Sequence, residues 1–302
     1  MSAAEGSNVL APGNHSIELH FGGRWRSYVV HVPAANAFRP RALVLNFHGG
    51  GGNARDHQAY IGMDALANQE DFLIAYPNGS GLFDSRLLTW NAGPCCGYAM
   101  NHTIDDVGFS RAVVADLAAR TSVDLDRVYA TGLSNGAMMA YRLGLEAPDL
   151  VAAIAPVAGA SAIGPNDLER SMPIMHIHSV DDPRALYGGG LGPPFPMTNQ
   201  RVLHAPVEKM LKVWRDADGC ADTSQTSASR RGGPHGEHSA TKLVYAPCRD
   251  GVEVVLWKMT GPGHVWPGGK PDYLTRWLGP STDAIDANRE IWGFLRRFAR
   301  HH

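Results

Sequence analysis

The chain has 302 residues, of which 44% are hydrophobic and 19% are charged, and its formal net charge is -2. This balance excludes a disordered tail protein and a basic nucleic-acid binder. A chain of this length suits one domain over residues 1–302 with a sizeable core.

The sequence also predicts no membrane partner. No apolar run approaches the roughly 18 residues that a membrane span requires. The opening MSAAEGSNVL lacks the charged start and the apolar stretch of a signal peptide. We therefore expect a soluble protein, and its oligomeric state stays open.

Short apolar runs that are rich in β-branched or aromatic residues and bounded by Gly, Pro or Asn predict the first strands. They are Ser27 to Val32, Ala42 to Phe47 and Phe72 to Tyr76. Helices and strands then alternate: a helix from Asp106 to Arg120, a strand Val128 to Thr131, a helix Ala137 to Glu146 and a strand Ala152 to Val157. Such alternation favours an α/β fold whose mostly parallel sheet carries helices on both faces.

The last third of the chain has a different pattern. A strand over Pro173 to His178 leads into a Gly/Pro-rich stretch, and residues 183–248 are predicted to form an insertion on the substrate side of the sheet. Within it, Ala205 to Trp214 is amphipathic, and the polar tract Asp222 to Lys242 is expected to be a mobile excursion. The predicted last strand is Val252 to Met259, and a helix from Asp283 to Ala299 closes the chain.

A candidate nucleophile lies between a predicted strand and a predicted helix. Gly132, Leu133, Ser134, Asn135 and Gly136 spell G-x-S-x-G at this junction. A sharp strand-to-helix turn would expose the serine hydroxyl, and a Cβ at either glycine would collide with a neighbouring strand or helix. A helix-capping serine in a glycine-rich connection is the alternative.

The partners of such a serine follow in the order that a serine hydrolase of this type requires. Asp181 and Asp182 come after the strand that ends at His178, and His264 lies in a Gly/Pro-rich loop after the last strand. An imidazole there is suited to general-base catalysis, and a carboxylate would fix its tautomer. The residues alone leave Asp181 and Asp182 as competitors.

The run His48-Gly49-Gly50-Gly51-Gly52-Asn53 predicts an oxyanion hole. Consecutive glycines let backbone N–H groups approach a substrate oxygen, so we expect the N–H groups of Gly50 and Asn135 to be the two donors. A phosphate-binding loop is disfavoured because no Lys-Ser/Thr pair follows. The cysteines lack C-x-x-C spacing, so no metal site and no cofactor are expected.

Two tryptophans and one basic tract are candidates for substrate contacts. Trp90 and Trp266 flank the motif segments and are predicted to line an acyl or aromatic subsite, with core packing as the alternative. The polar tract is locally basic, with Arg230, Arg231 and Lys242 among its residues. It would attract an anionic polymer if it is more than a solvated loop.

Together these segments resemble the extracellular polyhydroxybutyrate depolymerase-like esterases, which include feruloyl and acetylxylan esterases. The likeness rests on LVLNFHGGGGNA, TWNAGPCCGYAMNHTIDDVGF, RVYATGLSNGAMMAYRLG, PIMHIHSVDDP and GPGHVWPGG. The resemblance implies an α/β-hydrolase fold with Ser134 as nucleophile, His264 as base and, by alignment of His178 and Pro183, Asp182 as acid. The sequence departs from the pattern at Ser179, where glycine is usual.

The resemblance also implies export, to the periplasm or outside the cell, and oxidised cysteines. Cys220 and Cys248 would then close the base of the polar tract. Cys95 and Cys96 are adjacent, and we favour a bond between them over two separate bridges, with free thiols as the alternative in a cytosolic protein.

Three functions follow from these patterns. The first is hydrolysis of a carboxylic ester, either a polyester or hydroxyalkanoate oligomer or a hydroxycinnamoyl ester, through an acyl-enzyme. The second uses the same triad on amide bonds of an anionic polymer such as poly-aspartate, and the basic tract is its one support. The third is a non-catalytic binding module, which an intact Ser134, Asp182 and His264 disfavour.

Overall fold

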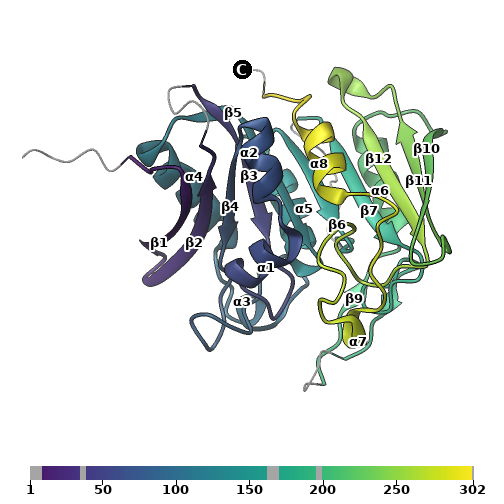
Figure 1. Ribbon diagram of the computed structural model, residues 1–302, viewed down its shortest axis with the longest axis horizontal. Helices are drawn as coiled ribbons and strands as arrows, with labels where there is room; N and C mark the ends of the chain where they lie inside the picture. The colour runs from purple at the N-terminus through teal and green to yellow at the C-terminus, as the bar shows by residue number, and fades with distance from the viewer. Residues whose placement is uncertain (1–8, 35–38, 162–169, 195–198, 301–302) are drawn as a thin grey trace, which may run out of the picture.

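A computed structural model describes residues 9–34, 39–161, 170–194 and 199–300. Their strands are β1 (Gly13–Phe21), β2 (Arg24–Val32), β3 (Arg41–Phe47), β4 (Leu73–Pro77), β5 (Val123–Leu133), β6 (Ala153–Val157), β7 (Ile174–Ser179), β8 (Gly190–Leu191), β9 (Leu203–His204), β10 (Gln225–Gly232), β11 (His238–Tyr245) and β12 (Val254–Thr260). All except β8 and β9 join one sheet in the order β1-β2-β4-β3-β5-β6-β7-β12-β11-β10 (Figure 1).

The centre of this sheet is parallel, as predicted. Strands β4, β3, β5, β6, β7 and β12 pair in parallel, whereas β1 and β2 at one edge and β11 and β10 at the other pair antiparallel. The carboxyl ends of parallel strands lie at one edge of a sheet, so the loops after β3, β5, β7 and β12 meet there. These are the loops that carry the predicted site residues.

Helices cover both faces of the sheet (Figure 1). They are α1 (Ala54–Ile61), α2 (Asp64–Glu70), α3 (Gly97–Asn101), α4 (Asp106–Arg120), α5 (Asn135–Glu146), α6 (Val207–Ala217), α7 (Thr275–Leu278) and α8 (Ala287–Leu295), with a 3-10 turn at Arg249–Gly251. Alternate residues of β3 serve two separate cores: Leu43 and Leu45 pack with apolar residues of α4, α5 and α6, and Val44 packs with those of α1, α2 and α8. This period of two explains why the central strands are apolar throughout.

The polar tract Asp222 to Lys242 was wrongly predicted as a mobile excursion. It contains β10 and most of β11, which extend the main sheet beyond β12. Ala240 of β11 is fully buried between polar neighbours that are more exposed, which is the alternation of an outer strand. Within the predicted insertion, the described residues that line the cavity reported below lie between Arg184 and His204.

Other differences concern the ends of the chain. Strand β1 was not predicted; its burial alternates along the strand, but Ile17 is the one residue of the nine that is buried. Helix α8 ends at Leu295, four residues before the predicted end. Across the part of the chain that the structure describes, no helix has the length and apolar character to cross a bilayer.

Candidate active site

Ser134 occupies a strained turn between β5 and α5. Its φ and ψ angles are 59° and -118°, a conformation that residues with a side chain rarely adopt. The N–H of Ser134 donates to the carbonyl of Val157 at 2.9 Å, which anchors the turn to the neighbouring strand β6. Strain of this kind is retained where the surrounding structure enforces it, often at functional sites.

The two glycines of the motif make this turn possible. A Cβ on Gly132 would lie 2.6 Å from the carbonyl oxygen of Phe47, and one on Gly136 would overlap the same oxygen and that of His48. Real Cβ atoms do not approach so closely, so any side chain here would push α5 away from β3. The sequence prediction for both positions is confirmed.

His264 and Asp182 are brought together across 82 residues of chain. The Nδ1 atom of His264 donates to Oδ2 of Asp182 at 2.7 Å, and the N–H of His264 donates to the carbonyl of Leu278 at 2.6 Å. Both side chains are buried. The bond assigns the proton of neutral His264 to Nδ1 and leaves Nε2 as a proton acceptor.

The environment of Asp182 keeps it ionised. Its Oδ1 accepts the N–H groups of Arg184 and Ala185 at 2.7 and 2.8 Å. Burial opposes the charge, but His264 and hydrogen bonds from His178 and His264 outweigh burial and hold the pKa of Asp182 well below its usual range. The competing Asp181 is exposed and accepts the N–H of Gly261 at 2.7 Å, away from the imidazole.

A cavity of about 490 Å³ contains both Ser134 and His264. No hydrogen bond joins these two side chains in the described structure, and such bonds are often long until substrate binds. The lining comes from the segments after β3, β4, β5, β7 and β12, and its residues are His48, Gly49, Gly50, Gly51, Gly52, Asn53, His57, Tyr60, Leu87, Cys95, Cys96, Leu133, Ser134, Asn135, Met138, Arg184, Ala185, Pro193, Val202, His204, His264, Tyr273, Leu274, Trp277 and Leu278. The cavity is therefore mainly apolar and has the hydroxyl of Ser134 and the imidazole of His264 in its wall.

The two predicted oxyanion donors also line the cavity. The N–H groups of Gly51 and Gly52 are bonded to the carbonyls of Leu88 and Gly49, at 2.8 and 3.0 Å. The N–H of Gly50 has no such partner among the described residues, and neither does that of Asn135 in the first turn of α5. Helix N-terminal N–H groups point along the helix axis and favour negative charge.

Three further histidines line the cavity, but burial works against their protonation. Burial lowers the pKa of His48 and of His204 to about 4 and that of His57 to about 3. None of the three has the close carboxylate contact that His264 makes with Asp182. Among the described residues, no group of three or more His, Cys, Asp or Glu side chains is placed to hold a metal ion.

These buried histidines predict a loss of stability in acid. An unfolded imidazole has a pKa near 6.5, so between pH 6.5 and about 4 the unfolded chain binds more protons than the folded one. As the pH is lowered from 6.5 to about 4, the free energy of unfolding should therefore decrease. His48 and His57 should each contribute roughly 3 kcal/mol to this decrease. Denaturant unfolding at pH 6.5 and at pH 4 measures the loss.

A matched pair of variants tests the cause. His57→Gln removes a buried titrating group and should cut the difference between the two pH values by roughly 3 kcal/mol. His235→Gln removes an exposed imidazole and should leave the difference as in the wild type. Equal pH profiles for both variants would contradict the assignment to His57.

Neither tryptophan predicted to contact substrate lines the cavity. Trp90 is fully buried, and its indole N–H donates to the carbonyl of His48 at 2.9 Å. Trp266 is 1% exposed, and its indole N–H donates to Oδ1 of Asn288 at 3.0 Å. Both tryptophans lie close to the motifs in sequence, as predicted, but their rings pack in the core beneath the loops and not in the cavity wall. The core-packing alternative therefore holds for both.

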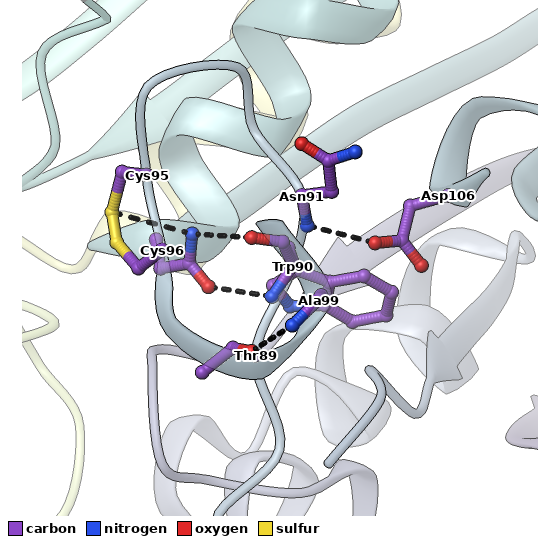
Figure 2. Close-up of a disulfide and its surroundings, with 8 residues drawn as sticks. Thr89, Trp90, Asn91, Cys95, Cys96, Ala99 and Asp106 are labelled. Carbon is purple, nitrogen blue, oxygen red and sulfur yellow. Dashed lines mark hydrogen bonds between the residues drawn. A yellow bond between two sulfur atoms is a disulfide. The ribbon is translucent and has the colours of Figure 1, made fainter. Parts of the chain in front are cut away.

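Figure 2 shows the loop that Trp90 anchors and the disulfide between Cys95 and Cys96, which directly precede α3. The side-chain amide of Asn135 accepts from the N–H of Trp90 at 2.7 Å and donates to its carbonyl at 3.1 Å. Asp106 accepts the N–H of Asn91 at 2.8 Å (Figure 2). These bonds tie the loop, and the part of the cavity wall that the two cysteines form, to the first residues of α4 and α5.

The second disulfide joins Cys220 to Cys248 at 1.99 Å between the sulfur atoms. It links the segment after α6 to the segment after β11 and so closes the base of the hairpin β10–β11, as the resemblance implied. In this hairpin Arg230 and Lys242 both pair with Glu290 of α8, at 3.2 and 3.6 Å. The basic tract is thus partly neutralised, and none of its residues lines the cavity.

The cavity residues that the sequence did not reveal lie mainly in two loops. Tyr273 and Trp277 come from the segment around α7, where Tyr273 stacks on Tyr60 at 4.0 Å between ring centroids. Arg184, Val202 and His204 come from the segment after β7. Trp277 is 54% exposed. An aromatic residue in a polar C-terminal loop was the one sequence feature that could have indicated that this loop forms part of the cavity wall.

Comparison with known proteins gives a consistent result. The family model described as Esterase PHB depolymerase matches residues 26–209. The protein NocK of Nocardia uniformis subsp. tsuyamanensis is 32% identical over 295 residues, which cover 92% of this chain and 81% of NocK. The poly(3-hydroxyalkanoate) depolymerase C of Paucimonas lemoignei is 27% identical over 258 residues, 78% of this chain and 58% of that protein.

A solved structure supports the fold. The acetyl xylan esterase from Aspergillus awamori has a TM-score of 0.52 and 17% identity, and the match covers 89% of this chain and 94% of that one. At this identity the likeness concerns the fold alone. The sheet, its two helical faces and the loops at its carboxyl edge are those of an α/β-hydrolase.

Proposed function

Because the chain belongs to the Esterase PHB depolymerase family and is a carboxylic ester hydrolase, we propose that it works through an acyl-enzyme on Ser134. His264 is the general base and Asp182 the carboxylate that orients it. The observation that carries this proposal is the 2.7 Å bond from His264 Nδ1 to Asp182 Oδ2, beside a cavity that His264 shares with Ser134.

The geometry supports the following sequence of steps. Ser134 Oγ attacks the ester carbonyl carbon while His264 Nε2 accepts the hydroxyl proton, and Asp182 stabilises the resulting imidazolium. The tetrahedral intermediate collapses, the C–O bond to the alcohol breaks, and His264 returns the proton to the leaving oxygen. Water then attacks the acyl-enzyme with the same base, which releases the acid and restores Ser134.

The N–H groups of Gly50 and Asn135 are the proposed oxyanion donors. Both residues line the cavity next to Ser134, and both N–H groups lack a partner in the described structure. A donor that is already in place stabilises the developing charge without reorganisation, and one such donor contributes about 10²- to 10³-fold to kcat. No step of this mechanism requires a cofactor.

The proposed substrates are hydroxyalkanoate oligomers or hydroxycinnamoyl esters. An apolar cavity of about 490 Å³ is of the size that takes a small organic ligand. Met138, Val202 and Leu278 provide apolar contacts for an alkyl chain, and Tyr60 and Tyr273 provide aromatic faces. A relative named as a poly(3-hydroxyalkanoate) depolymerase supports the first class.

The two alternative functions have less support. Cleavage of amides in an anionic polymer rested on the basic tract, which pairs with Glu290 and does not line the cavity. A non-catalytic binding module would have no need of a strained serine beside a base bonded to a buried carboxylate. We also propose that the protein is exported, which suits the disulfide between Cys220 and Cys248.

Trapping of the acyl-enzyme tests the proposal directly. The protein is mixed with p-nitrophenyl butyrate, quenched in acid and digested, and the peptides are analysed by mass spectrometry. We expect a burst of p-nitrophenol and a butyryl group on the peptide that contains Ser134. Turnover without a modified Ser134 peptide, or no turnover at all, would refute the mechanism.

A substrate panel then separates the candidates. Release of acid from 3-hydroxybutyrate oligomers, methyl ferulate and poly-aspartate is measured side by side at equal enzyme concentration. The proposal expects hydrolysis of at least one ester and none of poly-aspartate. Faster cleavage of poly-aspartate would favour the amide alternative.

A further inference from the structure

The carboxylate of Asp182 has a neighbour that the proposed mechanism does not use. Its Oδ1 accepts the backbone N–H groups of Arg184 and Ala185, and its Oδ2 accepts Nδ1–H of His264 at 2.7 Å. The further neighbour is Nε2 of His178, which lies 3.4 Å from Oδ2. An ionised carboxylate has about four lone-pair sites for hydrogen bonds, so His178 faces the site that the other donors leave.

The same ring nitrogen also anchors the backbone beside Asp182. Nε2 of His178 lies 2.8 Å from the carbonyl oxygen of Ala185, and the N–H of Ala185 donates to Oδ1 of Asp182 at 2.8 Å. Ala185 is therefore bonded to His178 through its carbonyl and to the carboxylate through its N–H. A shift of the His178 ring would disturb Asp182 by two routes, directly and through Ala185.

Two further buried groups extend this contact into the core. Nε2 of His176 lies 2.9 Å from Nδ1 of His178, and Oη of Tyr141 lies 2.9 Å from Nδ1 of His176. His176 and His178 stand two apart on β7 and share one face of the sheet, whereas Tyr141 lies on α5, the helix that begins after Ser134. Tyr141, His176 and His178 are at most 1% exposed.

The hydrogen-bond partners assign one direction to the protons of this chain. The carbonyl of Ala185 only accepts, so His178 carries its proton on Nε2 and accepts at Nδ1. His176 then donates from Nε2 and accepts at Nδ1 from the hydroxyl of Tyr141. With one proton on each ring, every nitrogen of the two imidazoles has a partner. The opposite direction would place the bare Nε2 of His178 against two acceptors, the Ala185 carbonyl and the Asp182 carboxylate.

The inner part of the chain stays uncharged. Burial and, to a smaller extent, the neighbouring His178 hold the pKa of His176 well below its usual range. Burial raises the pKa of Tyr141 well above its usual range. Neither His176 nor Tyr141 therefore gains or loses a proton near neutral pH, so the direction of the hydrogen bonds toward His178 does not change there.

We propose that His178 is a positioning residue for the triad acid, because its Nε2–H holds Asp182 in the orientation that receives His264. His176 and Tyr141 in turn hold the ring of His178. This inference rests on the proposed catalytic role of Asp182 and deepens it. The acid of such a triad acts through its fixed bond to the imidazole, and a carboxylate that turns away stabilises the imidazolium less without changing substrate binding. Loss of the His178 donor should therefore lower kcat and leave KM nearly unchanged.

Two substitutions that each keep one half of the hydrogen bonds of the His178 ring test this inference. His178→Gln places an amide N–H near the position of Nε2 and loses the acceptor for His176. His178→Asn places an amide oxygen near the position of Nδ1 and loses the donor to Ala185 and Asp182. A ring that is structural only predicts similar kcat values for these two variants.

The measured quantities are kcat and KM for p-nitrophenyl butyrate. We expect kcat of His178→Asn to fall about tenfold or more, which corresponds to one lost hydrogen bond to a charged group. We expect kcat of His178→Gln to stay within about threefold of the wild type, and KM to change less than about twofold in both variants.

Tyr141→Phe tests the far end of the chain. It removes the donor to His176, so it should lower the melting temperature, whereas kcat should stay within about threefold because the Ala185 carbonyl still sets the tautomer of His178. Tyr129→Phe is the matched control, since Tyr129 is fully buried and its hydroxyl donates to a backbone carbonyl outside this chain at 2.7 Å. It should also lower the melting temperature and leave kcat as in the wild type.

Competent active sites are counted by titration to completion with a serine-directed phosphonate, so that unfolding is not read as lost catalysis. A folded His178→Asn protein with the kcat of the wild type would show that His178 is structural only, and the inference would be wrong. A tenfold loss of kcat in folded His178→Gln would also refute it, which holds even if His178→Asn does not fold. An inactive wild type would count against the proposed function instead.

Discussion

Ser134→Ala, His264→Ala and the double variant should each hydrolyse p-nitrophenyl butyrate about 10⁵-fold more slowly than the wild type. A serine without its base is a poor nucleophile, and a base without its serine has no proton to accept. The two side chains act as one unit, so the losses do not add. Initial rates at saturating substrate, with KM measured for each variant, give the comparison.

The residual activity is as informative as the loss. Oxyanion donors remain in both variants, so each should retain more activity than water alone. Circular dichroism and melting temperature serve as controls, since alanine fits the same volume at position 134 without disturbing the turn. If the double variant were slower than either single variant by another factor of 10⁴ or more, Ser134 and His264 would act in separate steps and the proposed pairing would be refuted.

Part of the site could be predicted from the sequence, because the turn at Ser134 needs particular residue types and the order of strands and helices places His264. Gly132 and Gly136 are fixed by the carbonyl of Phe47, so a short motif between a strand and a helix predicted the turn at Ser134. The position of His264 after the last strand followed from the order of elements. The parallel centre of the sheet followed from the alternation of apolar strands with helices.

What the sequence did not reveal depends on contacts between distant segments. Trp90 and Trp266 are buried in the core, where the carbonyl of His48 and the side chain of Asn288 accept their indole N–H groups. No local pattern distinguishes such rings from rings in a pocket. Strand β10 reads as polar because an outer strand has little core to cover. The stack of Tyr60 on Tyr273 joins residues more than 200 positions apart.

The two aspartates illustrate the same limit at one site. Asp181 and Asp182 are adjacent and chemically identical, and the residues alone left them equal. In the folded chain Asp182 reaches His264 at 2.7 Å, whereas Asp181 bonds the N–H of Gly261. The turn after β7 decides between them, and the resemblance to a family was the one sequence argument for Asp182.

Asp182→Asn should lower kcat about 10⁴-fold with little change in KM. An amide presents an N–H where Oδ2 now accepts from His264, so the imidazole would turn to the wrong tautomer and could no longer take the proton of Ser134. Asp181→Asn is the matched control: it keeps the oxygen that accepts Gly261 N–H, so its kcat should stay within about threefold of the wild type. Steady-state rates at pH 8 measure both.

The dependence of kcat on pH provides a second test of the role of Asp182, because a variant that is merely less stable would not change the shape of this dependence in the expected way. With Asp182 replaced, the rate should recover as hydroxide replaces the missing base, so log kcat for Asp182→Asn should keep rising above pH 8, whereas the wild-type rate does not depend on hydroxide and should level off. Asp181→Asn should follow the wild type at every pH. A larger loss in Asp181→Asn than in Asp182→Asn would transfer the triad acid to Asp181, and the hydrogen bond between Asp182 and His264 would then have to be structural.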